Sequence, residues 1–193
     1  SYETLEAYAR KVETRVDKKT RVETRTIISS PDELAAATLE GFTVTEDMLG
    51  NYSQTTYGRT APSRSSEETP DGLYHLHFVP KKLTREVSAV LHIEGLNNIR
   101  SATCRLGGVA ESIFLATGKT SANTVTQEFT PSNPEFSPGS PFNGTLSCEF
   151  EIFGLNVIDN NNLHLDALLV DGKTEFEGDC TNVKITENDD GTG

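Results

Sequence analysis

The sequence predicts an all-β fold, an antiparallel β-sandwich of about seven strands. Three observations predict it. From Pro31 onward, apolar runs of strand length are separated by Gly, Pro, Asn and Ser. Residues 87–94 alternate apolar and polar side chains, as a half-buried strand does. No segment between these runs reads as a crossover helix, so a parallel α/β sheet is not expected.

Length and composition predict one main domain. A chain of 193 residues that is 35% hydrophobic can bury one sizeable core. We assign residues 30–186 to the sandwich and residues 1–29 to an N-terminal linker or an extra strand or helix. Residues 187–193 lack apolar anchors and are expected to form a disordered acidic tail.

The N-terminal region leaves two questions open. Residues 2–16 carry Leu5, Tyr8, Ala9, Val12 and Val16 at helical spacing, but the apolar stripe is thin, so either a helix or an extra strand is possible. The charged, alternating segment from Thr20 to Ile28 reads as a strand. It either closes the sheet of this domain or is donated during assembly.

The strands expected in the remaining chain are bounded by turn residues. They are Leu73–Val79, Val87–Ile93, Ser101–Leu106, Glu111–Ala116, Thr124–Thr130, Thr145–Leu155, Leu163–Val170 and Thr174–Phe176. The polar segment Asn51–Asp71 is expected to be a long exposed loop. Gly107 and Gly108 permit positive φ, and we predict that they form a tight hairpin turn between the strands on either side.

Charge and cysteine content exclude several classes of protein. The formal net charge is −12, which disfavours binding to nucleic acid or to an anionic membrane surface. No apolar run approaches the roughly 18 residues that span a bilayer. Ser1 in place of an initiator Met predicts a processed form or an excised piece. Cys104, Cys148 and Cys180 are too few and too widely spaced for a disulfide framework, and Cys148 reads as a small buried hydrophobe.

Two motifs resemble ligand sites but fit poorly. Gly118-Lys119-Thr120 matches the end of a P-loop, yet Ile113 stands where the first glycine is required, so we interpret it as a turn at a strand end. In Asp159-Asn-Asn-Asn162, Leu163 stands at the third ligand position of a calcium loop, and a hairpin turn explains the run better.

The remaining polar residues do not form a recognisable catalytic set. His75, His77 and His92 could meet on paired strands, but no carboxylate-rich loop frames them, and His164 is expected to point to water. Glu149 and Glu151 flank core positions and are expected to face outward together. In a chain with 29 acidic residues, such a pair of carboxylates is expected without any catalytic role. We therefore assign no catalytic, cofactor-binding or metal residue and expect no enzyme and no cofactor.

Three stretches of the sequence resemble those of a known protein family. Cys104-Arg-Leu-Gly-Gly-Val-Ala-Glu-Ser-Ile-Phe-Leu-Ala-Thr-Gly118, preceded by residues 87–99, resembles the "apolar strand, Gly, small, Ser, apolar strand, Thr-Gly" passage of the fimbrillin-like proteins of type V pili. Ser30-Pro-Asp-Glu-Leu34 and Phe78-Val-Pro-Lys-Lys-Leu83 add to the likeness. The resemblance covers about residues 30–183.

The resemblance implies a fold, a location and partners. It implies a transthyretin-like or Greek-key sandwich, corresponding to the second domain of such proteins, in a parent that is lipid-anchored on the extracellular side of the outer membrane of an anaerobic Gram-negative bacterium. It further implies a fimbrial structural, anchor or adhesion module whose partners are other pilus subunits or host or bacterial surface ligands, bound by β-strand pairing. The alternative is a surface glycan- or protein-binding module unrelated to pili, with Tyr52, Tyr57 and Phe142 gathered on one face.

Overall fold

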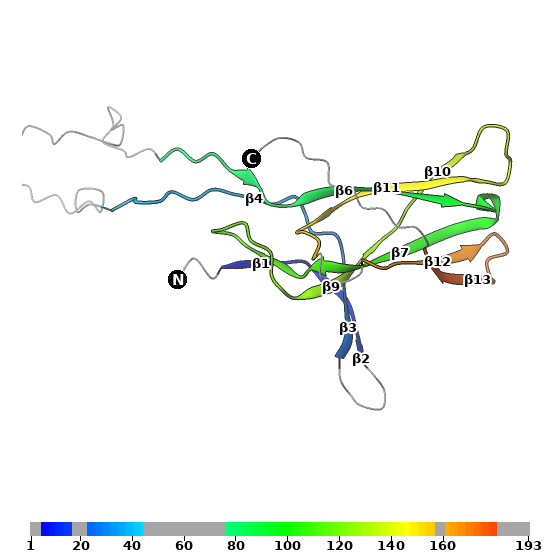
Figure 1. The fold of residues 1–193 in the computed structure, drawn as a ribbon, viewed down its shortest axis with the longest axis horizontal. Coiled ribbons are helices and arrows are strands. Elements are labelled where there is room, and N and C mark those ends of the chain that lie inside the picture. Colours follow the sequence, from blue (N-terminus) through cyan, green and yellow to red (C-terminus); the bar gives the residue numbers. More distant parts are fainter. Residues whose placement is uncertain (1–4, 17–22, 45–75, 157–160, 181–193) are drawn as a thin grey trace, which may run out of the picture. The chain divides into compact units, whose positions relative to one another are not determined.

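The computed structural model describes residues 5–16, 23–44, 76–156 and 161–180 (Figure 1). Its regular structure there is almost entirely β, which confirms the predicted class. The strands are β1 (Glu6–Tyr8), β2 (Lys11–Val16), β3 (Glu23–Ile28), β4 (Ala35–Ala36), β5 (Lys81–Lys82), β6 (Arg85–Ile93), β7 (Ile99–Ala110), β8 (Ser112–Phe114), β9 (Thr124–Phe129), β10 (Asn133–Phe136), β11 (Gly144–Ile152), β12 (Leu163–Leu169) and β13 (Glu175–Asp179), and the 3-10 turn η2 spans Leu96–Asn98. The described residues form more strands than the seven or so that were predicted, because several of the strands are only two to four residues long.

The chain divides into two units. The first comprises Ser1–Ala35 and Lys82–Gly193, and the second comprises Ala36–Lys81. In the second unit, residues 76–79 are not in a strand, so the predicted strand 73–79 is wrong for that part. The expected loop 51–71 and residues 187–193 lie outside the described ranges, and the predicted domain limits at residues 30 and 186 stay predictions.

The N-terminal segment of the first unit is extended. Residues 6–8 pair with β8 and residues 11–16 pair with β3, so the helix alternative is wrong for residues 5–16. Strand pairing satisfies the backbone here, whereas the thin apolar stripe offered a helix little surface to bury. The pair β3–β9 is parallel, through Ile27 and Ile28, whereas the pairs β12–β13, β12–β7, β2–β3 and β7–β9 are antiparallel. The strand β3 therefore pairs within a sheet of its own domain, and β2 forms the edge beyond it.

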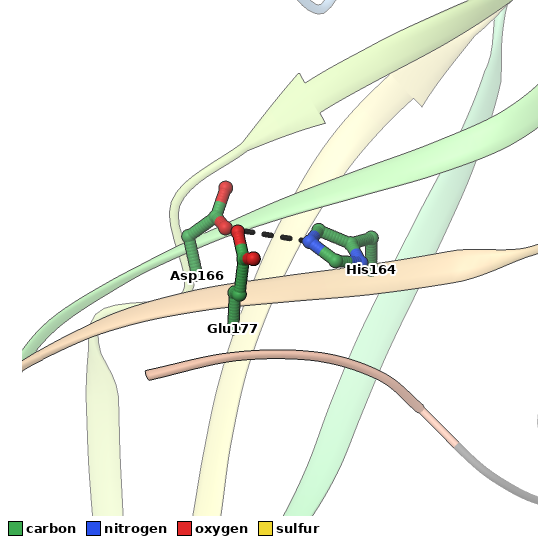
Figure 2. Close-up of side chains that lie close together, drawn as sticks. All are labelled: His164, Asp166 and Glu177. Carbon is green, nitrogen blue, oxygen red and sulfur yellow. Dashed lines mark ion pairs between the residues drawn. The ribbon is translucent and has the colours of Figure 1, made fainter. Parts of the chain in front are cut away.

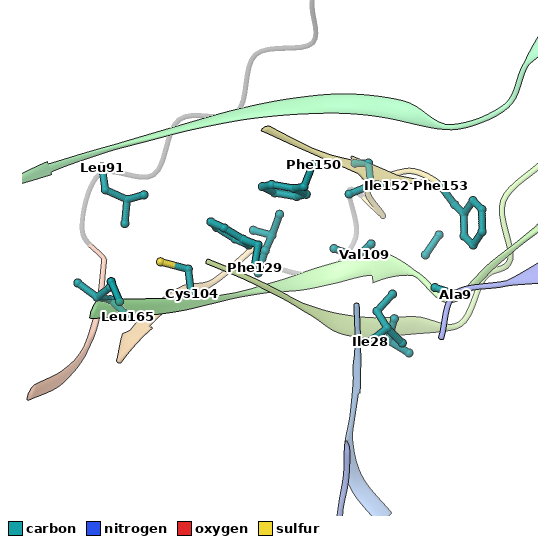
Figure 3. Packing of buried hydrophobic residues seen from close by; sticks show 14 of the residues in the cluster. Ala9, Ile28, Leu91, Cys104, Val109, Phe129, Phe150, Ile152, Phe153 and Leu165 are labelled. Carbon is teal, nitrogen blue, oxygen red and sulfur yellow. The ribbon is translucent and has the colours of Figure 1, made fainter. Parts of the chain in front are cut away.

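Two sheets build the core of the first unit. One has the order β10-β11-β6, and the other has the order β13-β12-β7-β9-β3-β2. Phe129 of the six-stranded sheet stacks on Phe150 of the three-stranded sheet, with ring centroids 4.3 Å apart (Figure 3). Buried residues from both sheets surround this pair, among them Leu91, Cys104, Ile152 and Leu165. The arrangement is sandwich-like, because the inward side chains of two sheets share one core.

The paired glycines do not form a hairpin turn, and that prediction is wrong. They lie inside β7, which pairs with β9 on both sides of them. Between Leu106 and Val109, β7 carries one residue more than β9, and Gly108 has a φ of 76°. This is a β-bulge with glycine in the left-handed region. Leu106 and Val109 are three residues apart, so in a regular strand they would face opposite sides. The extra residue of the bulge places both on the buried face.

Candidate functional site

A row of charged side chains crosses the outer face of the six-stranded sheet. It consists of Glu128 on β9, Arg105 on β7, His164 and Asp166 on β12, and Glu177 and Asp179 on β13; we call these six residues the outer-face cluster. They alternate with buried residues such as Cys104, Phe129 and Leu165, so they point away from the core.

Strand register brings the cluster together. His164 lies opposite Asp179, and Asp166 lies opposite Glu177, in the antiparallel pair β12–β13. On the other side, Arg105 lies opposite both His164 and Glu128. Directly opposite side chains in a sheet have their Cβ atoms about 5 Å apart. Residues distant in sequence therefore meet on one face.

Arg105 anchors the interior of the row. Its Nε donates to Glu128 Oε2 at 3.0 Å, and its Nη1 donates to Asp166 Oδ2. The Arg105 side chain is only 15% exposed, so both ion pairs are partly shielded from water. One guanidinium thus binds two carboxylates and holds the Asp166 carboxylate in place.

His164 lies between carboxylates on both of its ring nitrogens. Its Nδ1 is 2.8 Å from Asp179 Oδ1. Its Nε2 is 3.4 Å from Asp166 Oδ1, the ion pair drawn in Figure 2. Glu177 approaches the same point, and one ligand atom from each of His164, Asp166 and Glu177 lies within 4.8 Å of the others. These three residues could hold a metal ion. The six-residue cluster is also anionic, because four carboxylates face one guanidinium when His164 is neutral.

Sequence reasoning did not identify this cluster. His164 was expected to point to water, and it does lie on the outer face, but there it is half-buried and contacts two carboxylates that the sequence did not indicate. The signal was the pair of motifs His164-x-Asp166 and Glu177-x-Asp179, each with the period of two that places both side chains on one face of a strand. Only the register of β12 against β13 shows that the two motifs meet.

The other histidines and the two turn motifs lie apart from the outer-face cluster or outside the described residues. His75 lies outside the described residues, so the three-histidine alternative is untested, while His92 lies on β6 opposite Thr145. Gly118 has a φ of 65°, and its amide donates to Phe114 O at the end of β8. That geometry is the predicted turn. Asp159 and Asn160 lie outside the described residues, as do Tyr52 and Tyr57.

Glu149 and Glu151 have different surroundings. Glu149 is exposed, whereas Glu151 is half-buried and its Oε1 accepts a hydrogen bond from Lys82 Nζ at 2.8 Å. This bond to Glu151 is the main cause that raises the pKa of Lys82 above its ordinary value. The two carboxylates are therefore not an equivalent outward pair, and Glu151 serves as an ion-pair partner.

The three thiols are free and poorly ionised. Burial, with smaller contributions from Cys180, Cys148 and Asp166, raises the pKa of Cys104 to about 12. Burial also raises the pKa of Cys148 and of Cys180. Because the thiolate is the nucleophilic form, these cysteines are suited to packing. Cys148 packs against the core as a partly buried residue, in agreement with its predicted role.

The strand β6 is a long edge of the three-stranded sheet. It pairs along all nine of its residues with β11, and no other described strand pairs with it in that sheet. Val87, Ala89, Leu91 and Ile93 face inward or are half-buried, while Ser88 and Val90 are exposed. An edge of this kind presents unpaired amides and carbonyls to which another strand can add.

Exposed aromatic side chains lie at the hairpin of β10 and β11. Phe136 ends β10, and Phe142 lies in the connection before β11 and is 60% exposed. Ser140 Oγ accepts hydrogen bonds from the amides of Phe142 and Asn143, which orders this connection.

Among the described residues, no helix has both the length and the apolar character that a bilayer span requires.

Comparison with known proteins gives one family and one fold. Residues 1–130 match the family described as "Domain of unknown function (DUF5119)". No curated protein matches the chain. A crystal structure described as that of "a putative adhesin from Bacteroides ovatus ATCC 8483" is similar, with a TM-score of 0.53 and 14% sequence identity over 93% of this chain. The present chain spans 57% of the length of that protein.

Proposed function

The chain belongs to the DUF5119 family, and we propose that it is a non-enzymatic module of a bacterial cell surface that acts in adhesion. In the finer form of the proposal, it is a fimbrillin-like structural, anchor or adhesion module of a type V pilus. Its parent is lipid-anchored at the outer membrane, and it joins other subunits or surface ligands through the edges of its β-sheets.

The likeness in fold supports the adhesion role. The Bacteroides ovatus protein has a similar fold and is described as "a putative adhesin", and that role is transferred here by analogy. The raised pKa values of the three thiols support a non-enzymatic role, since they disfavour thiolate nucleophiles at neutral pH.

The main support for assembly by strand addition is the edge strand β6. This strand is nine residues long, pairs only on one side within the described sheet, and carries neutral side chains from Val87 to Leu91. By contrast, β13 at another edge carries Glu175, Glu177 and Asp179, and β10 contains Pro134. Charges and proline protect an edge against strand addition, so β6 is the better acceptor.

A second candidate function rests on the β10–β11 hairpin. Phe136 and Phe142 are exposed on one ordered hairpin, and exposed aromatic side chains are common anchors in binding surfaces. A glycan- or protein-binding module would use this hairpin in place of the β6 edge. Phe142→Ala would then abolish ligand binding and leave assembly intact.

Photo-crosslinking in intact source cells tests the proposal. A photoreactive amino acid at Val90, which is 55% exposed on β6, should crosslink the protein to another envelope protein. The same residue at Ser147, the position directly opposite on the central strand β11, is the matched control and should crosslink far less. Protease added to intact cells should also digest the protein.

Two further variants test the strand edge itself. Ser88→Lys together with Val90→Lys places charges on the edge and should abolish the crosslinked assembly, while Ser147→Lys should preserve it. Protection of the protein from protease in intact cells would contradict the surface location. Equal crosslinking from positions 90 and 147 would contradict the edge mode.

A further inference from the structure

We propose that His164, Asp166 and Glu177 bind one divalent transition-metal ion of the Zn²⁺ class, which fastens the edge strand β13 to β12. The ligands are His164 Nε2, Asp166 Oδ1 and a carboxylate oxygen of Glu177. This proposal concerns the outer face of the six-stranded sheet and is independent of the adhesion role.

The spacing of the ligand atoms fits a metal ion. Zn²⁺ is bound at about 2.0–2.1 Å by imidazole nitrogen and carboxylate oxygen, so tetrahedral ligands lie roughly 3.4 Å apart. His164 Nε2 and Asp166 Oδ1 are 3.4 Å apart, and all three ligand atoms lie within 4.8 Å of one another. Glu177 is exposed, so its side chain can change rotamer to adjust this spacing.

The outer contacts are those that metal ligands usually have. A metal-bound histidine commonly donates its second ring N–H to a carboxylate, and bound carboxylates are in turn hydrogen-bonded. His164 Nδ1 is 2.8 Å from Asp179 Oδ1, which leaves Nε2 as the acceptor that faces Asp166 and Glu177. Arg105 holds Asp166 Oδ2, so Asp166 Oδ1 stays directed toward His164 Nε2.

Charge also favours a cation at this point. The side chain of Glu177 makes no hydrogen bond or ion pair with any described residue, although it lies opposite Asp166. Two carboxylates opposite each other repel. A divalent ion between them would replace this repulsion with two attractive bonds, and it would cross-link the two strands that carry them.

The donor set selects the class of metal. One imidazole and two carboxylates suit Zn²⁺ or a similar transition-metal ion, whereas Ca²⁺ takes six to eight oxygen ligands. Three protein ligands leave one position of a tetrahedral ion for water. The expected occupant is therefore a four-coordinate ion with one bound water.

Calorimetric titration of the untagged full chain with ZnCl₂ tests the proposal. We expect saturable binding of one ion and a rise in the melting temperature. Glu177→Gln and His164→Ala should each abolish binding, and Glu177 is exposed, so its variant should fold normally. Asp179→Asn should weaken affinity about 10–100-fold while the stoichiometry stays at one, because Asp179 only orients the histidine.

Matched variants distinguish this site from other donors. His92→Ala removes an exposed histidine on β6, and Cys180→Ser removes a half-buried thiol; both should bind Zn²⁺ as the parent does. The proposal is overturned if no saturable binding occurs. It is also overturned if Glu177→Gln retains full affinity, if Cys180→Ser loses the ion, or if CaCl₂ binds in preference to ZnCl₂.

Discussion

Phe129 and Phe150 stack across the two sheets with their planes inclined by only 20° and their centroids 4.3 Å apart. Each ring comes from a different sheet, so the pair joins the two layers at the centre of the core. Both side chains are buried, and the strands that carry them, β9 and β11, are not hydrogen-bonded neighbours. The stability of the sandwich should therefore be sensitive to either ring.

We expect Phe150→Ala to destabilise the protein by about 3–5 kcal/mol, because it removes a buried ring and leaves a cavity between the sheets. Urea unfolding followed by circular dichroism measures this change. Phe142→Ala, which truncates an exposed ring, should change the free energy of unfolding by less than about 0.5 kcal/mol. Similar losses in both variants would show that the stacked pair is not central to the core.

The glycine bulge gives a second prediction. Gly108→Ala should cost about 1–2 kcal/mol, since Gly108 has a φ of 76° and an L side chain is strained there. Gly107→Ala is the matched control. A Cβ at Gly107 would meet Asn162 O at 3.6 Å, an ordinary contact, so thermal unfolding should show a smaller loss. If Gly107→Ala cost more, the bulge geometry would be wrong.

The turn between β12 and β13 predicts a pH dependence. Hydrogen bonds from the Thr174 hydroxyl, and then from the amides of Thr174 and Lys173, lower the pKa of Asp171. A lowered folded-state pKa contributes stability above the ordinary value of the carboxyl, and this contribution is lost as pH falls through the folded-state pKa. Asp171→Ala should therefore destabilise the protein at neutral pH, and by less in acid.

Urea midpoints of both proteins across acidic and neutral pH measure the effect. Glu94→Gln, which removes an exposed carboxylate that accepts no hydrogen bond from the described residues, is the control and should change the urea midpoint little at neutral pH. A constant difference between Asp171→Ala and the parent at every pH would contradict the linkage.

The thiols give a fourth prediction. Cys104 is fully buried and has a pKa raised to about 12, so iodoacetamide should modify it more slowly than Cys148 or Cys180 in the folded protein. Mass spectrometry of each peptide over time measures the three rates. In denaturant the rates should become similar. Faster labelling of Cys104 in the native protein would mean that the core opens readily.

Part of this structure could be predicted from local sequence pattern. Val87, Ala89, Leu91 and Ile93 alternate with polar residues, and β6 forms where that alternation predicts a strand. Alternation reports burial of one face, which depends only on neighbours in sequence. The same reasoning located most of β9, β11 and β12.

Other features depended on pairing between distant segments. The glycines at 107 and 108 fit a hairpin turn or a bulge equally well, and only the continued pairing of β7 with β9 selects the bulge. Residues 6–8 and 11–16 form strands because β8 and β3 offer them partners.

The sequence by itself determined that this protein would be all-β, because the period of its apolar residues is a local property. Tertiary structure alone decided that His164, Asp166 and Glu177 would meet. Two short polar motifs share a site only when the register of β12 against β13 places them opposite each other, and a slip of one residue would turn them to opposite faces.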